Sequence, residues 1–571
     1  MDLFGLTGIF LVGAAIVVPV IYLLSWLSGS IFWGTFIAVI VLVLAAAKIK
    51  WKKIRLDTSS VLLLLGSFVF STWIMFKTFH GGSGGEIFVG SNNVFDFGHA
   101  LGIIRSMSWG TNIPLRSPFF AGLPFFYNFF FNFWVAVLEY FRIPIVWAMN
   151  VPSILSFTAL LVVIYYLPQI IAKQKPLVGW VAVLFTITNS SLTFWKLLAQ
   201  KADILHLPTY PFAGPFDGST ISIFVTLNNY TNQRHLAFAS ALGLFLFIIV
   251  SKWATDRKIT LTKMALLGLV TGFLLFWNMV VYALVVALCL LVLVLHERWK
   301  PGLAYVCVSC LVGILWMLPY IGYASHIVPF LQQLTAGALP KPTQWSLVDY
   351  LWQNLGLLPV VAALGVIVLT KSPRKIFGLF VIFFIVECVA SGIGHRGFEQ
   401  KTFSFLITGI NALAAIGVGW IWKKMKVAAV LLVFVLTISG FVDLIPIKNE
   451  FAFPLIGRDT APVIAWIHSS TPKDAVFVSY SDIVDPVVLA GRRNYFGFFG
   501  NIGSMDRTPI VLQVYRGDAA VAKANHISYI LVPKWQKNDF PYVVDERTLR
   551  SIYPVAFEDD RVLILRTGLS L

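Results

Sequence analysis

One acidic residue, Asp96, is placed where a carboxylate could act as a general base. It lies in a long polar stretch, residues 79–123, within a chain in which only 12% of the residues are charged. The residues that follow have the apolar spacing of a short helix lying on the bilayer surface, namely Phe97, Leu101, Ile104 and Met107. Two interpretations of Asp96 compete: the N-cap of that helix, or a base held at the membrane–water interface.

Cationic side chains in other polar loops could bind a phosphate or pyrophosphate group, because charged donors bind phosphate oxygens strongly. The pairs Arg234-His235 and His395-Arg396 stand out, since each follows polar residues and adjoins an apolar run. Further candidates for substrate binding are His99, Arg105 and Lys401. The competing interpretation is that these side chains anchor helix ends by reaching to the membrane surface.

The sequence gives only a weak indication of a metal site. Asp96 with His99 or His206 could hold a divalent cation, but the spacing matches no recognised ligand motif. All four cysteines lie within apolar runs, so we expect neither a disulfide nor a zinc site. The sequence has no Walker loop, dinucleotide fingerprint or nucleophile elbow, which argues against soluble nucleotide chemistry.

The composition is that of an α-helical polytopic membrane protein. Of the 571 residues, 58% are hydrophobic, and the mean hydropathy is +0.82. The formal net charge of +17 does not indicate nucleic-acid binding, because the basic residues lie in short loops between apolar runs. The apolar runs predict about 13 transmembrane helices, give or take one. The runs are near residues 5–27, 31–48, 59–78, 124–141, 147–170, 177–195, 235–252, 264–278, 279–296, 302–321, 353–370, 376–394, 402–422 and 427–446. The count is open by one because the stretch 264–295 is too long for one helix and short for two, and Trp277-Asn278 near its middle predicts a tight hairpin.

The basic loops predict the orientation in the cell membrane. Clusters of Lys and Arg place five loops in the cytoplasm: those near residues 48–55, 252–263, 296–300, 371–375 and 423–426. The Asp96 loop and everything after about residue 450 then lie outside. Lys173 and Lys175 conflict with this scheme, because two crossings between residues 123 and 170 would put them outside as well. Either one of those two segments does not fully cross, or they contain three short ones.

The chain divides into three predicted parts. Residues 1–58 form a two-helix N-terminal extension, residues 59–450 a transmembrane domain with its first outer loop at 79–123, and residues 451–571 a small extracytoplasmic α/β domain. In the last part, Asp459 to Pro462 has the pattern of a helix start. Strands are expected over residues 475–480, 527–532 and 561–565.

This arrangement resembles the GT-C superfamily of integral-membrane glycosyltransferases, in particular prokaryotic members of uncharacterised function. The resemblance is carried by the stretches Val94 to His99, Arg105-Ser106, Pro118 to Gly122, Trp466 to Phe477 and Leu489 to Arg493. Many members have one helix before the acidic loop, whereas three are expected here. Asp96 also has no acidic neighbour, unlike the paired acids of some members, which puts metal dependence in question.

The resemblance implies a glycosyltransferase that moves a hexose or pentose from a polyprenyl-phosphate donor to an extracytoplasmic lipid, glycan or protein acceptor. It implies that Asp96 is the catalytic base that deprotonates the acceptor hydroxyl. Cationic side chains would then stabilise the phosphate leaving group, where negative charge develops.

Other classes remain open on the sequence alone: a transporter or flippase of lipid-linked or anionic glycans, a glycan polymerase or ligase, and a non-catalytic assembly protein. A transporter should carry charges within its spans or inverted repeats. The sequence shows no repeat, and the acidic candidates are Glu139, Glu387 and Asp443. A cavity shared by Asp96 and the cationic residues would favour the enzyme.

Overall fold

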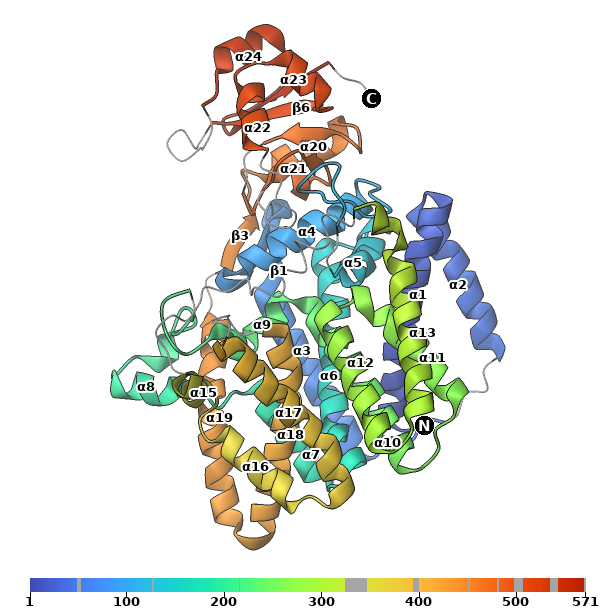
Figure 1. Ribbon diagram of the computed structural model, residues 1–571. Helices are drawn as coiled ribbons and strands as arrows, with labels where there is room; N and C mark the ends of the chain where they lie inside the picture. Colours follow the sequence, from blue (N-terminus) through green and yellow to red (C-terminus); the bar gives the residue numbers. More distant parts are fainter. Residues whose placement is uncertain are drawn as a thin grey trace.

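The protein is a multi-pass membrane protein whose helices form a bundle capped at one end by a small α/β region (Figure 1). The computed structural model describes residues 1–48, 53–125, 128–214, 216–323, 347–393, 400–449, 452–479, 482–497, 507–534 and 543–568. The predicted site residues His395 and Arg396 lie outside these ranges.

Within the described residues, seven helices are long and apolar enough to cross a membrane. They are α1 (Leu3–Ser28), α3 (Thr58–Thr78), α6 (Ile145–Ala172), α10 (Arg234–Thr255), α13 (Trp299–Met317) with the 3-10 turn after it, α18 (Gln400–Lys424) and α19 (Lys426–Asn449). An eighth span results if α15 (Leu347–Leu355) and α16 (Leu358–Val368), which meet at 84°, are counted as one. The predicted count of about 13 spans is not confirmed.

Several further apolar helices are not among these seven. They are α2 (Ile31–Lys48), α5 (Phe130–Tyr140), α7 (Pro176–Ile187), α11 (Leu261–Phe273), α12 (Met279–Leu295) and α17 (Lys371–Ile393). Asn278 separates α11 from α12 and caps α12 by accepting hydrogen bonds from the backbone N–H groups of Val280 and Val281. The tight turn expected at this asparagine is therefore present.

The length of α5 helps to decide on which side of the membrane Lys173 and Lys175 lie. Its 11 residues extend about 16 Å, roughly half of the hydrocarbon thickness of a bilayer. The next helix, α6, has 28 residues and is long enough to cross. One crossing between residues 123 and 170 favours the first alternative, in which one of the two segments does not fully cross. Lys173 and Lys175 then lie on the side opposite Asp96.

The loop that carries Asp96 is tied to a distant part of the chain by a small antiparallel sheet. Its strands are β1 (Phe79–Gly81), β2 (Ile87–Gly90) and β3 (Ala452–Ile456), in the order β1-β2-β3. Val89 pairs with Phe453, so the loop after α3 and the segment after α19 share one sheet. These two segments must therefore lie on the same side of the membrane.

Helix α4 (Val94–Ser108) lies across the end of the bundle, below the C-terminal sheet region (Figure 1). The helix predicted from apolar spacing is therefore present. Its environment differs from the expectation, because the apolar face is buried by protein rather than free to enter the bilayer. Phe97, Leu101, Ile104 and Met107 are each no more than 1% exposed. Helix α5 packs on one side of α4 and the short helix α21 (Pro486–Leu489) packs on the other.

The C-terminal region contains a mixed five-stranded sheet in the order β5-β4-β6-β8-β7. The strands β4 (Val476–Val478), β5 (Arg493–Asn494) and β6 (Tyr529–Pro533) run parallel, whereas β7 (Val555–Glu558) and β8 (Val562–Arg566) add antiparallel pairs. The flanking helices are α20 (Ala461–Ser470), α22 (Thr508–Tyr515), α23 (Ala519–Ala524) and α24 (Glu546–Ile552). The three predicted strands and the proline-led helix start are found close to their expected positions.

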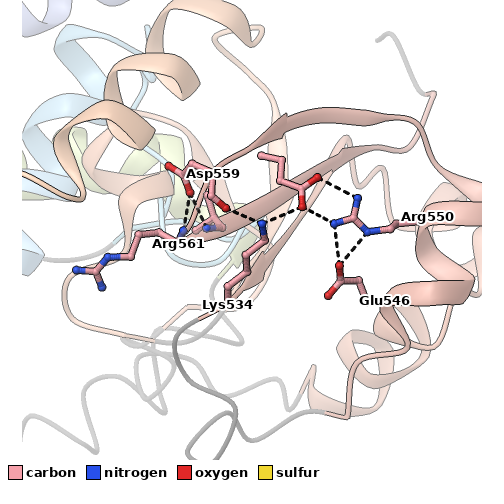
Figure 2. Close-up of polar contacts among 7 residues, drawn as sticks. Lys534, Glu546, Arg550, Asp559 and Arg561 are labelled. Carbon is pink, nitrogen blue, oxygen red and sulfur yellow. Dashed lines mark hydrogen bonds and ion pairs between the residues drawn. The ribbon is translucent and has the colours of Figure 1, made fainter.

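Ion pairs at the outer edge of this sheet hold α24 to the strands (Figure 2). Arg550 Nη2 lies 2.6 Å from Glu558 Oε1, and Lys534 Nζ lies 2.8 Å from the same oxygen. Hydrogen bonds from these two cations lower the pKa of Glu558 to about 2. The side chains are partly exposed, so each pair contributes little to stability.

Candidate active site

A small, partly open cavity lies between α4, α5, α6 and the start of α10. Four of the residues singled out from the sequence line it together: Asp96, His99, Arg234 and His235. Asp96 and Arg234 are far apart in sequence, so the cavity exists only in the folded chain. This shared cavity is the geometry that the enzyme interpretation requires.

Asp96 lies in the first turn of α4, three residues after the N-cap residue Asn93. It is therefore not the helix cap that one of the two sequence interpretations proposed. Burial raises the pKa of the Asp96 carboxyl to about 6, and the positive charge of Lys401 partly opposes this effect. A carboxyl with a pKa close to neutral is mostly ionised at pH 7 and is still basic enough to take a proton.

Lys401 is the second residue of α18 and is 6% exposed. It does not line the cavity, yet its charge acts on Asp96. A buried ammonium group keeps a neighbouring carboxylate in its ionised form. The charge of Lys401 therefore favours the ionised form of Asp96, and substrate binding by Lys401 stays a prediction.

The guanidinium group of Arg234 is buried and held by protein acceptors. Its Nε donates to the carbonyl of Thr231 at 2.6 Å, and its Nη2 donates to Thr78 Oγ1 at 2.9 Å and to the carbonyl of Met75 at 3.3 Å. Its Nη1 points to Asn150 Oδ1 and to the sulfur of Met75. Arg234 thus links the start of α10 to α3 and α6. Because protein acceptors already bind its N–H groups, Arg234 contributes mainly positive charge to the cavity rather than free hydrogen-bond donors.

That charge has no carboxylate partner among the residues that the structure describes. The ring of Phe97 lies 5.2 Å from the guanidinium carbon, which is within the range of a cation–π contact. Anchoring at the membrane surface does not account for a side chain that is only 3% exposed. A buried cation without a counter-ion favours an anionic ligand nearby.

The two histidines of the cavity differ in environment. His99 is 8% exposed and stacks on Phe119 with ring centroids 5.0 Å apart. Burial lowers the pKa of His99 to about 3, so its ring is neutral near pH 7 and supplies no positive charge. His235 Nε2 lies 3.4 Å from the side-chain amide nitrogen of Asn128.

Arg105, a candidate for substrate binding from the sequence, lies away from the Asp96 cavity. It lies nine residues beyond Asp96, about 13 Å along α4, and it does not line the cavity. Its Nε pairs with Glu139 Oε1 at 3.3 Å, and its Nη1 donates to the carbonyl of Leu489 at 2.8 Å. Ser108 Oγ donates to the other oxygen of Glu139 at 2.6 Å. Arg105 therefore joins α4 to α5 and to the C-terminal region.

Of the candidate cation ligands, His99 shares the cavity with Asp96 and His206 does not. His206 Nδ1 pairs with Asp203 Oδ2 at 2.8 Å on an exposed surface, apart from the Asp96 cavity. Among the residues that the structure describes, no three His, Cys, Asp or Glu side chains form a cluster that could hold a metal ion. The site is therefore built from one carboxyl, nearby positive charge and neutral polar groups.

Solved structures of other membrane proteins share the fold of this chain over most of its length. The apo crystal structure of ArnT from Cupriavidus metallidurans superposes with a TM-score of 0.50 at 13% identity, over 89% of this chain and 97% of that one. This chain has the GT-C fold. The archaeal oligosaccharyltransferase from Archaeoglobus fulgidus, tethered with an acceptor peptide, gives a TM-score of 0.47 at 11% identity, over 83% of this chain and 69% of that one. No family model and no curated protein matches the sequence.

The GT-C resemblance inferred from the sequence is thus confirmed for the fold. The cavity also contains amide side chains that sequence reasoning did not select: Asn128, Asn132, Asn232 and Gln233. A signal for two of them was present, because residues 228–233 form a dense polar run directly before Arg234. In an apolar chain such a run should face a polar ligand or a polar neighbour.

Proposed function

We propose that the protein is a membrane glycosyltransferase that transfers a sugar from a polyprenyl-phosphate donor to an extracytoplasmic lipid, glycan or protein. The observation that carries the proposal is the cavity in which Asp96 meets the positively charged start of α10. The polyprenyl-phosphate donor follows from the GT-C resemblance. The electrostatic surroundings of the cavity support a phosphate group at that position.

The start of α10 supplies two kinds of positive potential. Two residues of the first turn of this 22-residue helix, Arg234 and His235, line the cavity. A helix amino end carries partial positive charge and unpaired N–H groups, which suit a phosphate. The guanidinium charge of Arg234 adds to this potential. Such fixed charge stabilises a phosphate leaving group as its negative charge grows.

Each group then has a defined role in the transfer. The Asp96 carboxylate takes the proton of the acceptor hydroxyl while that oxygen bonds to the anomeric carbon of the sugar. The bond from the anomeric carbon to the phosphate oxygen breaks, and its electron pair leaves with the polyprenyl phosphate. Lys401 keeps Asp96 ionised before the reaction. Binding of the lipid-linked donor from the bilayer would place its phosphate beside α10.

The raised pKa of Asp96 predicts how transfer depends on pH. Below about pH 6 the carboxyl is protonated and cannot accept a proton, so the rate should fall about tenfold per pH unit. Above about pH 6 the rate should approach a plateau, because the base is already ionised. Initial rates measured between about pH 4.5 and 8, on protein shown to stay folded, would check this. A rate that is flat or rises toward acid would contradict the role of Asp96 as base.

The topology predicts where the C-terminal region is accessible. Because β2 pairs with β3, the Asp96 loop and the residues from β3 onward should both face the outside. Protease added to cells with a permeabilised outer barrier should cut off the C-terminal region, while the cytoplasmic loops stay protected. Cleavage only in inside-out vesicles would contradict this orientation.

The activity itself can be tested without knowing the acceptor. Purified protein would be incubated with polyprenyl phosphates that carry different hexoses or pentoses, together with a membrane extract. Mass spectrometry should find a component heavier by one sugar residue, with free polyprenyl phosphate as the second product. Donors that remain intact throughout the panel would contradict the proposal.

A further inference from the structure

Two amide side chains form part of the cavity wall next to Asp96. Asn232 ends the short helix α9 (Asn228–Asn232), and Gln233 precedes α10 as its N-cap residue. Both residues line the cavity together with the Asp96 carboxyl. Gln233 is only 6% exposed. Its backbone N–H donates to the carbonyl of Asn229 at 3.0 Å, which fixes this residue at the cavity.

The carbonyl oxygens of these amides are buried and have no hydrogen-bond partner among the residues that the structure describes. The Nδ2 group of Asn232 donates to the carbonyl of Asn92 at 3.1 Å, so its Oδ1 atom must point elsewhere. Buried polar atoms are nearly always hydrogen-bonded, and leaving an acceptor unsatisfied destabilises the fold. Two such oxygens in one cavity therefore indicate a bound group that donates hydrogens.

The required ligand chemistry follows from the acceptors. The amide oxygens of Asn232 and Gln233 and the carboxylate of Asp96 all accept hydrogen bonds, so their ligand must present several donors. A phosphate diester carries no hydrogen and cannot satisfy them. A sugar ring carries several hydroxyl groups at short spacing and can satisfy all three. A divalent cation is the competing ligand, since amide and carboxylate oxygens also bind hard cations.

We propose that Asn232 and Gln233 hold hydroxyl groups of a sugar ring beside Asp96 and so contribute to sugar specificity. This proposal rests on the proposed function, because it names which part of the substrate occupies the wall of the same cavity. The phosphate of the donor lies toward Arg234 and His235 in the first turn of α10, and the sugar lies against the side-chain amides of Asn232 and Gln233. The hydroxyl groups can belong to the donor sugar or to a sugar acceptor, and binding measurements separate these sources.

The test compares ligands that differ only in the sugar. The donor probes are short-chain polyprenyl phosphates with glucose, mannose, galactose, N-acetylglucosamine or arabinose, and the same lipid phosphate without sugar. The acceptor probes are alkyl glycosides of the same sugars. Affinities are measured on the full-length protein in detergent. For the wild type, we expect at least one sugar-bearing probe to bind more tightly than its sugar-free counterpart.

The variants Gln233→Met and Asn232→Leu remove the acceptor oxygens at similar side-chain size. Each should reduce the sugar-dependent gain in affinity by about three- to tenfold. Binding of the sugar-free lipid phosphate should be unchanged. The matched control is Gln174→Met at the end of α6, whose amide nitrogen donates to the carbonyl of Ala172 outside the cavity. This control should bind every probe as the wild type does.

A second readout separates ligand binding from a structural role. Because Gln233 Oε1 is unsatisfied in the ligand-free protein, Gln233→Met should unfold at or above the wild-type temperature. Asn232→Leu also loses the hydrogen bond to the carbonyl of Asn92, so its unfolding temperature should be slightly lower. A purely structural amide would instead give a lower unfolding temperature with no selective loss of sugar affinity. The two probe sets separate the sources of the sugar. If the variants lose the sugar-dependent gain in affinity only for the lipid phosphates, the ligand is the donor sugar. If they lose it only for the alkyl glycosides, the ligand is the acceptor.

Three outcomes would overturn the proposal. The wild type could show no sugar-dependent gain in affinity, or both variants could keep the full gain. The third is that the variants lose affinity for Mn2+, measured as the competing divalent cation, and retain their affinity for the sugar probes. The proposed function is decided separately by product formation. If sugar is transferred while Gln233→Met keeps the full gain, the function stands and the amide proposal falls. If the gain depends on the amides while no donor is ever consumed, the amide proposal stands and the glycosyltransferase falls.

Discussion

Asp96→Asn is expected to lower the rate of sugar transfer by about 10²–10⁴-fold, the usual effect of losing a general base. The amide has nearly the same shape as the carboxyl, so the cavity and α4 should persist. The amide cannot take the acceptor proton, and it removes the negative charge that faces Lys401. Initial rates with a lipid-linked donor that the wild type accepts would measure the loss.

The control for this substitution is the same change at an exposed aspartate. Asp203→Asn alters a surface pair with His206 apart from the cavity and should leave the rate unchanged. Both variants should elute as single species and unfold close to the wild-type temperature. If Asp96→Asn turned over at nearly the wild-type rate, the role of Asp96 would be structural.

Glu139→Ala is expected to have the largest effect on stability. The Arg105 and Glu139 side chains are each 6% exposed and lie 3.3 Å apart. Removing one partner of a buried pair leaves an uncompensated charge and typically lowers the free energy of unfolding by about 3–5 kcal/mol. Since Arg105 also holds the carbonyl of Leu489, α4 should loosen from both α5 and the C-terminal region. The unfolding temperature in detergent would measure the effect.

Two comparison variants make this prediction specific. The double variant Arg105→Met with Glu139→Met removes both charges and should recover much of the lost stability, because no unpaired charge remains. Lys534→Met breaks an exposed pair with Glu558, and its effect should be close to zero. If Glu139→Ala were as mild as Lys534→Met, the Arg105–Glu139 pair would not be what holds α4.

Local patterns allowed much of the architecture to be predicted. The apolar spacing from Phe97 to Met107 indicated α4, because residues close in the sequence determine helical periodicity. Pro462 marked the start of α20, since proline fits the first turn of a helix. Short continuous apolar runs marked β6 and β8 for a similar reason. None of these features depends on contacts between distant parts of the chain.

Features that depend on distant contacts could not be predicted. The pairing of Val89 with Phe453 joins two segments that neither local pattern relates. Arg105 and Glu139 each looked available for a ligand or a transport path, and only the fold shows that they neutralise one another. The buried position of α4 reflects the C-terminal region packed over it, which the helix's own apolar face could not indicate.

The candidate site was predictable in part for the same reason. Asp96 was recognisable as a carboxylate in a loop of an apolar chain, and Arg234 with His235 as a charged start of a span. That they line one cavity depends on the tertiary structure and could not be read from the sequence. The occupied hydrogen bonds of Arg234 are also tertiary, because Thr78 and Met75 come from α3. Sequence alone favoured direct phosphate contacts, and the fold favours a contribution through charge.

The central claim is that this protein breaks the bond between a sugar and a polyprenyl phosphate with Asp96 as the base. Its most direct test uses proteoliposomes that contain the protein, a donor labelled in the sugar, and a membrane extract as the source of acceptor. Equal amounts of labelled acceptor and free polyprenyl phosphate should form with the wild type, and Asp96→Asn should form both at least about a hundredfold more slowly. Recovery of the labelled lipid intact, even if it has moved across the bilayer, would contradict the claim.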